Sequence, residues 1–204
     1  MNKDFIKMKK FRTRFSKLVL ILLIIGWIFG KPKYQVGGLG GEIVDVIGLI
    51  LCTTATLGRI WCAFYISGFK NRKVVSDGPY SMSRNPLYLY SLLGAIGIGL
   101  VTDTISVLAF VIVAFAIYYP FVIIGEEKKL EVVLGQEYLD YKKSVPRFFP
   151  KFSLLKQPKE YVVKPKVFFK DLKDCTMFLI TFNAIILINA LKNSGIIPTF
   201  FNIY

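Results

Sequence analysis

The sequence predicts an all-α integral membrane protein: a helical bundle of about five transmembrane helices plus a cytoplasmic amphipathic helix at the interface. Three observations predict this class. The chain of 204 residues is 54% hydrophobic and has a mean hydropathy of +0.52. Its apolar residues come in long blocks, and its basic residues gather in alternate loops. We therefore expect a single membrane domain over residues 1–204.

Five apolar blocks are the candidate transmembrane helices, since a helix that spans a bilayer needs roughly 20 mainly apolar residues. They are residues 15–30, 42–66, 87–101, 105–124 and 174–191. The first and third are short, so neighbouring helices or thinned lipid must compensate. Pro120 is expected to kink the fourth helix near its end.

The basic residues predict the orientation. Of 27 Lys and Arg, 23 lie in residues 1–17, 67–86 and 126–173, and three lie in the alternate loops. Loops rich in Lys and Arg face the cytoplasm. We therefore expect a multi-pass protein with a cytoplasmic N-terminus. The net charge of +14 is explained by this pattern and by attraction to anionic lipid headgroups, so no nucleic-acid partner is expected.

Several kinds of chemistry are excluded by composition. The chain has no histidine, which removes the commonest general base and the commonest metal ligand. Cys52, Cys62 and Cys175 fall in or at the ends of apolar blocks without a paired spacing. They are expected to be packing residues, and no metal site or disulfide is predicted.

Two polar blocks, residues 78–90 and 126–150, flank the hairpin of the third and fourth spans. The hairpin returns the chain to its starting side, so the blocks should meet at one cytoplasmic face. Residues 126–145 have helical periodicity and predict an interfacial amphipathic helix. Residues 151–171, rich in Lys and Pro, predict an irregular basic segment.

The charged residues of these blocks have two interpretations each. Arg84 and Asn85 precede a predicted helix, whose N-terminus attracts carboxylate or phosphate, but Arg84 is also explained as a lipid-facing charge. Arg59 lies inside a span, where it either faces a polar cavity or snorkels to headgroups. Glu126 and Glu127 point about 100° apart on a helix, so one can face the bundle and the other Lys or water.

The aromatic pair Tyr138 and Tyr141 lies on one helical face. It would either stack a ring or contact a cation, or it would form part of the aromatic belt of a membrane interface. Spacing alone favours the belt.

The two blocks together resemble the isoprenylcysteine carboxyl methyltransferase and phospholipid methyltransferase superfamily, integral membrane enzymes that use S-adenosylmethionine. The first motif corresponds to residues 78–90, Gly-Pro-Tyr-x-x-x-Arg-Asn-Pro-x-Tyr-x-Tyr. The second corresponds to Glu-Glu-x-x-Leu from Glu126, then Gly-x-x-Tyr-x-x-Tyr from Gly135, then Val-Pro-Arg from Val145 and a final Pro150. The similarity spans about residues 55–150 and includes Arg59-x-Trp61.

The resemblance implies S-adenosyl-L-methionine as cofactor, a membrane lipid or lipidated acceptor as partner, and roles for particular residues. The implied cofactor-binding residues are Asn85, Pro86, Tyr88, Glu126, Glu127, Tyr138 and Tyr141. The implied substrate-binding residues are Arg59, Trp61 and Arg147, and the implied catalytic residues are Arg147, Glu127 and Arg84. No metal ligand is implied.

Two departures from the motif bear on the acceptor. Asn85 stands where the carboxyl methyltransferases have His, which favours the phospholipid branch and an amine. The absence of histidine favours a carboxylate acceptor, which needs no general base. Because these two features favour different acceptors, carboxylate and amine both stay open. Tyr90 replaces a Gly and is expected to narrow the space beside it. Two alternative functions also remain: a nicotinamide-dependent reductase of the sterol reductase type, and a non-catalytic membrane scaffold.

Overall fold

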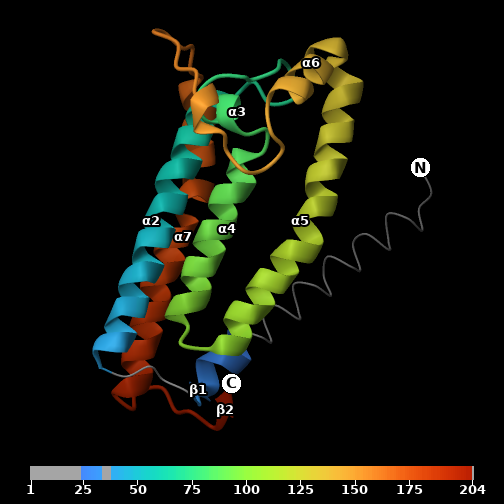
Figure 1. The fold of residues 1–204 in the computed structure, drawn as a ribbon. Helices are drawn as coiled ribbons and strands as arrows, with labels where there is room; N and C mark the ends of the chain where they lie inside the picture. Colours follow the sequence, from blue (N-terminus) through green and yellow to red (C-terminus); the bar gives the residue numbers. More distant parts are fainter. Residues whose placement is uncertain (1–23, 34–37, 204) are drawn as a thin grey trace, which may run out of the picture.

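The computed structural model describes residues 24–33 and 38–203, and within them the chain is an all-α bundle, as the sequence predicts (Figure 1). The long helices are α2 (Leu39–Ile66), α4 (Pro86–Val101), α5 (Ile105–Leu134) and α7 (Pro165–Asn193). Short elements connect them: α3 (Pro79–Met82), α6 (Gln136–Ser144) and the 3-10 helix η1 (Phe152–Leu154).

Three of the described helices are long and apolar enough to cross a membrane: α2, α5 and α7. The fourth apolar helix, α4, has 16 residues. The predicted first span, 15–30, falls mostly outside the described residues, although residues 24–29 are helical. The chain is therefore an integral membrane protein.

Helix α4 lies at the centre of the bundle and packs against α2, α5 and α7. Small residues permit this close approach. A Cβ on Gly97 would lie 2.7 Å from the carbonyl oxygen of Gly48 on α2, and one on Gly94 would lie 2.4 Å from the ring of Phe178 on α7. Helix α5 is joined to α4 by a short turn and leans away from it toward the other end (Figure 1).

One end of the bundle carries α3, α6 and η1, and we call it the motif end (Figure 1). At the opposite end β1 (Gly30–Pro32) pairs in parallel with β2 (Phe201–Ile203). Lys192 Nζ donates to the carbonyl oxygens of Trp27, at 2.7 Å, and Gly30, at 3.2 Å. This strand pair was not expected from the sequence.

The prediction that a separate interfacial helix begins at residue 126 is wrong. Residues 126–134 continue α5 without a break, and the helix ends only where Gly135 adopts a φ of +60°. Glu, Lys and Leu are strong helix formers, so nothing between residue 126 and Gly135 interrupts the helix. A separate short helix, α6, follows. Helix α5 also runs through Pro120.

The predicted irregular segment 151–171 is also too long. Helix α7 begins at Pro165, nine residues before the expected start of the last span at 174. Proline is favourable at the first helical position, because a backbone N–H at that position would have no hydrogen-bond partner within the helix. The remaining part is tied to the motif end: Gly78 N donates to Lys156 O at 2.7 Å, and Lys151 N donates to Met82 O at 3.0 Å.

Candidate functional site

The two polar blocks meet at the motif end, as the hairpin argument predicts. The backbone N–H of Arg84 donates to the carbonyl oxygen of Pro146 at 2.9 Å. The hydroxyl of Tyr141 donates to the carbonyl oxygen of Tyr80 at 2.7 Å. Segments 61 or 62 residues apart in the sequence are thus fixed to one another by direct hydrogen bonds.

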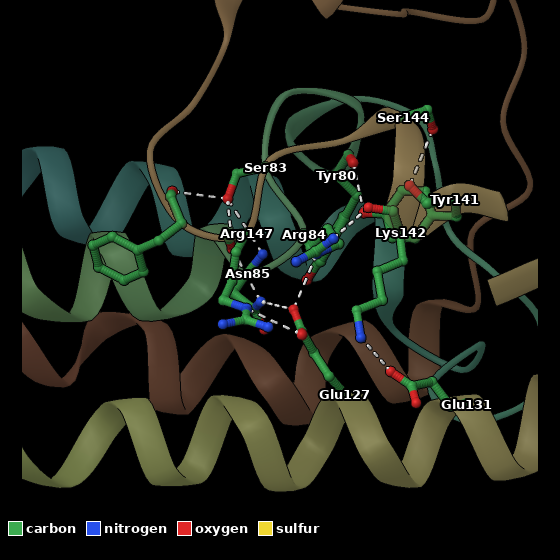
Figure 2. A network of polar contacts seen from close by, with 11 residues as sticks. Tyr80, Ser83, Arg84, Asn85, Glu127, Glu131, Tyr141, Lys142, Ser144 and Arg147 are labelled. Atoms are coloured by element: carbon green, nitrogen blue, oxygen red, sulfur yellow. Dashed lines mark hydrogen bonds and ion pairs between the residues drawn. The ribbon is translucent and has the colours of Figure 1, made fainter. Parts of the chain in front are cut away.

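Glu127 is the centre of this junction (Figure 2). Its Oε1 accepts from Arg84 Nε at 3.0 Å and from Asn85 Nδ2 at 3.1 Å, and its Oε2 accepts from Arg147 Nε at 3.1 Å. Asn85 Nδ2 also donates to the carbonyl oxygen of Arg147 at 3.0 Å. One carboxylate at the end of α5 therefore contacts the first motif block, through Arg84 and Asn85, and the Val-Pro-Arg segment of the second, through Arg147.

The Glu127 carboxylate and its first partner are withdrawn from solvent. The side chains of Glu127 and Arg84 are 3% and 8% exposed, whereas that of Arg147 is 50% exposed. Arg84 donates a further hydrogen bond to the carbonyl oxygen of Lys142. A buried ion pair is costly to break, because the remaining charge is left uncompensated.

A cavity of about 320 Å³ lies beside this junction, and we call it the polar cavity because several charged side chains line it. Its walls come from the end of α2, the 70–75 loop, the start of α4, and facing residues of α5 and α6. The predicted site residues that line it are Arg59, Arg84, Asn85, Pro86, Tyr88, Glu126, Tyr138 and Tyr141.

The two adjacent glutamates have different surroundings. Glu126 lines the polar cavity, is 42% exposed, and lies 3.6 Å from Lys70 Nζ. Glu127 does not line this cavity and is occupied by its three donors. The expectation that one acid faces the bundle and the other Lys or water is met, because adjacent helical residues point in different directions.

A second, apolar cavity of about 330 Å³ lies between α4 and α5. Leu92, Ile112 and Phe115 are among the apolar residues that line it, and Arg147 and Phe148 of the second motif block also line it. Tyr119 lines both the apolar and the polar cavity. Its ring stacks on Phe115, with centroids 3.7 Å apart.

Tyr138 and Tyr141 are buried and line the polar cavity, so the belt that spacing favours is not their setting. Burial raises the pKa of Tyr138 to about 12, with a further contribution from the Glu127 carboxylate. Burial also raises the pKa of Tyr141. Both hydroxyls thus stay protonated at neutral pH.

Two predicted residues lie elsewhere. Trp61 packs against the apolar cluster of Cys62, Tyr65, Val75 and Tyr80, and it does not line either cavity. Tyr90, which was expected to narrow the space beside it, does not line the polar cavity. Its ring lies against α2 at Gly58, where an added Cβ would come within 2.2 Å of the ring.

Sequence reasoning missed several cavity residues. Ser91 accepts from Arg59 Nη1 at 2.5 Å, and Tyr119 separates the two cavities. Both lie in apolar spans, where a Ser or Tyr carries no motif signal. Lys70 and Lys73 were seen only as topology charges, although the 70–75 loop folds over the polar cavity.

The chain is similar to a known protein family and to named relatives. The model of the phospholipid methyltransferase family matches residues 42–137. The chain is 35% identical over 187 residues to the nickel-cobalt-cadmium resistance protein NccN of Alcaligenes xylosoxydans xylosoxydans, covering 90% of the chain and 85% of the relative. It is 35% identical over 163 residues to the cobalt-zinc-cadmium resistance protein CzcN of Cupriavidus metallidurans, covering 80% and 74%. No solved structure matches the chain significantly.

Proposed function

Because the chain belongs to the phospholipid methyltransferase family, we propose that it transfers a methyl group from S-adenosylmethionine to a lipid or lipid-modified acceptor at the cytoplasmic face. The observation that carries the proposal is the pair of neighbouring cavities. A polar cavity lined by both motif blocks adjoins an apolar cavity within the bundle, and Tyr119 is common to both.

The polar cavity has groups that suit the cofactor. Its volume of about 320 Å³ is within the usual range for ligand sites, about 300 to 1,000 Å³. The Glu126 carboxylate suits an ammonium or ribose hydroxyls. The start of α4 has no side-chain cap, so its positive end suits a carboxylate. Tyr138 and Tyr141 offer aromatic surface for an adenine ring.

S-Adenosylmethionine, when bound, supplies a methyl group on a sulfonium that is open to in-line displacement. The residues of this chain contribute position: the Glu127 junction holds the blocks of Arg84 and Arg147 in fixed relation, and the apolar cavity orients the tail of an acceptor. Alignment of two reactants supplies a large share of the rate in such a reaction.

The direct test is calorimetry with the purified protein in detergent. We expect S-adenosylhomocysteine to bind with micromolar affinity, about −8 kcal/mol, and Asn85→Ala to weaken binding at least tenfold, about 1.4 kcal/mol. Incubation with labelled S-adenosylmethionine and total membrane lipid should then yield a labelled lipid.

The rival functions give different results in the same assay. Binding of NADPH without S-adenosylhomocysteine would identify a reductase. Binding of neither would leave a scaffold and overturn the proposal.

The relatives are named for resistance to nickel, cobalt, zinc and cadmium. We propose that the methylated product contributes to tolerance of such metal ions here. Loss of tolerance on deletion, restored by the wild type but not by a variant without methyl transfer, would support this link. Equal rescue by both would refute it.

A further inference from the structure

We propose that the outward face of α7 is the interface through which two copies of this chain pair within the membrane. Such pairing is independent of the methyl transfer proposed above. Three features of the molecule support it: an amide side chain at mid-membrane depth, the spacing of the residues beside it, and the position of the predicted first span.

One polar side chain of α7 points outward in the middle of an apolar span. Helix α7 is long and apolar enough to cross a membrane. Asn183 lies nine residues from one end of the predicted span 174–191 and eight from the other. At 1.5 Å per residue it is roughly 12 to 14 Å from either end. Its side chain is exposed, so hydrocarbon would surround it in a single copy.

The amide group of Asn183 is only partly satisfied. Its Nδ2 donates to the carbonyl oxygen of Leu179 at 2.8 Å, within the same helix. In the described part of the chain, Oδ1 accepts no hydrogen bond and Nδ2 has no second acceptor. Lipid tails offer no hydrogen bonds, so an unpaired amide in the bilayer core is costly. Such side chains commonly bond to another helix, and a partner helix is therefore expected on this face.

The residues beside Asn183 have the spacing of a helix-pairing seam. Positions 176, 180, 183, 187 and 190 are separated by alternate steps of four and three residues, which is the heptad pattern of coiled coils. Ile180 and Leu187 are 58% and 60% exposed, and Ala190 is also exposed. Thr176 and Ala190 are small, which lets two helices approach closely. A single polar residue in such a seam fixes the register of the helices.

The helices among residues 24–33 and 38–203 leave this seam uncovered. Helix α7 packs against α2 and α4 through another side, on which Cys175, Phe182 and Ile185 are buried. The described end of the predicted first span lies on that side too. Trp27 packs against the cluster of Phe182 and Ile185, and Lys192 donates to the carbonyl oxygen of Trp27. The seam is turned roughly 135° around α7 from this side, at about 100° per residue.

A second copy of this chain suits the seam because an amide group is self-complementary. In a two-fold pair, each residue meets its own counterpart across the axis. The free N–H of one Asn183 can then donate to Oδ1 of the other and receive a hydrogen bond in return. Both copies cross the membrane in the same direction, so their α7 helices run parallel. No residue that lines the polar or the apolar cavity lies on α7, so pairing leaves both cavities open.

Cross-linking in membranes that contain the full chain tests the interface. The compared variants are Leu187→Cys on the seam and Ile117→Cys on α5, because the two side chains are 60% and 61% exposed. The native Cys52, Cys62 and Cys175 are buried, so the wild type measures the background. With a short bis-maleimide we expect Leu187→Cys to give a cross-linked dimer of two 23.2 kDa chains, and Ile117→Cys at least tenfold less.

Energy transfer between donor-labelled and acceptor-labelled copies in phosphatidylcholine vesicles measures the strength of pairing. Asn183→Leu should weaken pairing at least fivefold, because the hydrogen bonds between the two helices are lost. Asn183→Gln keeps the amide and should pair within threefold of the wild type. Circular dichroism of each variant checks that the helices are intact.

Four results would overturn the proposal. The first is a wild type that stays monomeric in vesicles. The second is equal cross-linking of Leu187→Cys and Ile117→Cys. The third is unchanged pairing of a folded Asn183→Leu variant. The fourth is an intramolecular cross-link in a chain that carries both Leu187→Cys and Leu22→Cys, because the predicted first span would then cover the seam.

Discussion

Replacement of Glu127 by Gln is the sharpest test of the junction between the motif blocks. The carboxylate is 3% exposed and accepts hydrogen bonds from Arg84, Asn85 and Arg147 at 3.0 to 3.1 Å. Glutamine keeps one acceptor oxygen but has no charge. Its NH₂ group would then face the Nε donor of Arg147, or that of Arg84 if the amide were flipped.

The expected loss follows from burial. Loss of one partner of a buried ion pair costs about 3 to 5 kcal/mol, because the other charge stays buried. Arg84 is 8% exposed and would be left as a buried charge without a carboxylate partner, whereas Arg147 is 50% exposed and water can solvate it. We therefore expect Glu127→Gln to lower the free energy of unfolding by about 3 kcal/mol, at the lower end of that range.

The matched control is the neighbouring acid. Glu126 is 42% exposed and lies 3.6 Å from Lys70, so Glu126→Gln should cost less than about 1 kcal/mol. Both variants can be measured without cofactor by titration with a denaturing detergent. The fluorescence of Trp27 and Trp61, which both pack against core clusters, reports unfolding.

A double-mutant cycle of Glu127→Gln with Arg147→Gln should give a coupling above about 0.5 kcal/mol, since the two side chains are in contact. Equal destabilisation by Glu127→Gln and Glu126→Gln, or a coupling near zero, would refute the role assigned to Glu127.

Two further predictions concern topology and packing. The partition of basic residues predicts that single cysteines at positions 72 and 155 are protected from impermeant labels in intact cells, whereas one at position 203 is labelled. Surface labelling at position 155 would overturn the cytoplasmic placement of the site. Gly97→Ala should lower the free energy of unfolding by about 1 to 3 kcal/mol, because its Cβ would lie 2.7 Å from the backbone of α2. Gly125→Ala has no atom within 4 Å of the new Cβ and is the control, and equal losses in the two variants would contradict the close packing of α2 and α4.

Much of the fold was predictable because it depends on the pattern of apolar and polar residues along the sequence. Apolar blocks identified α2, α4, α5 and α7, and the hairpin between α4 and α5 placed both motif blocks at one end. Helix ends were less predictable. Helix α5 ends at Leu134 because Gly135 has a positive φ, and helix α7 begins at Pro165. Both ends depend on local backbone conformation, which competes with the helix propensity of the neighbouring residues.

The sequence by itself determined the membrane class, the two motif blocks and their meeting at one end, because hydropathy, charge and turn residues act over short stretches of chain. Only the tertiary structure decided which side chains share a wall. It separated Glu126, in the polar cavity, from Glu127, in the junction, and it turned Tyr90 onto Gly58. It also brought Tyr119 between the two cavities. Those outcomes depend on the packing of helices against one another, and periodicity along one helix does not specify its partners.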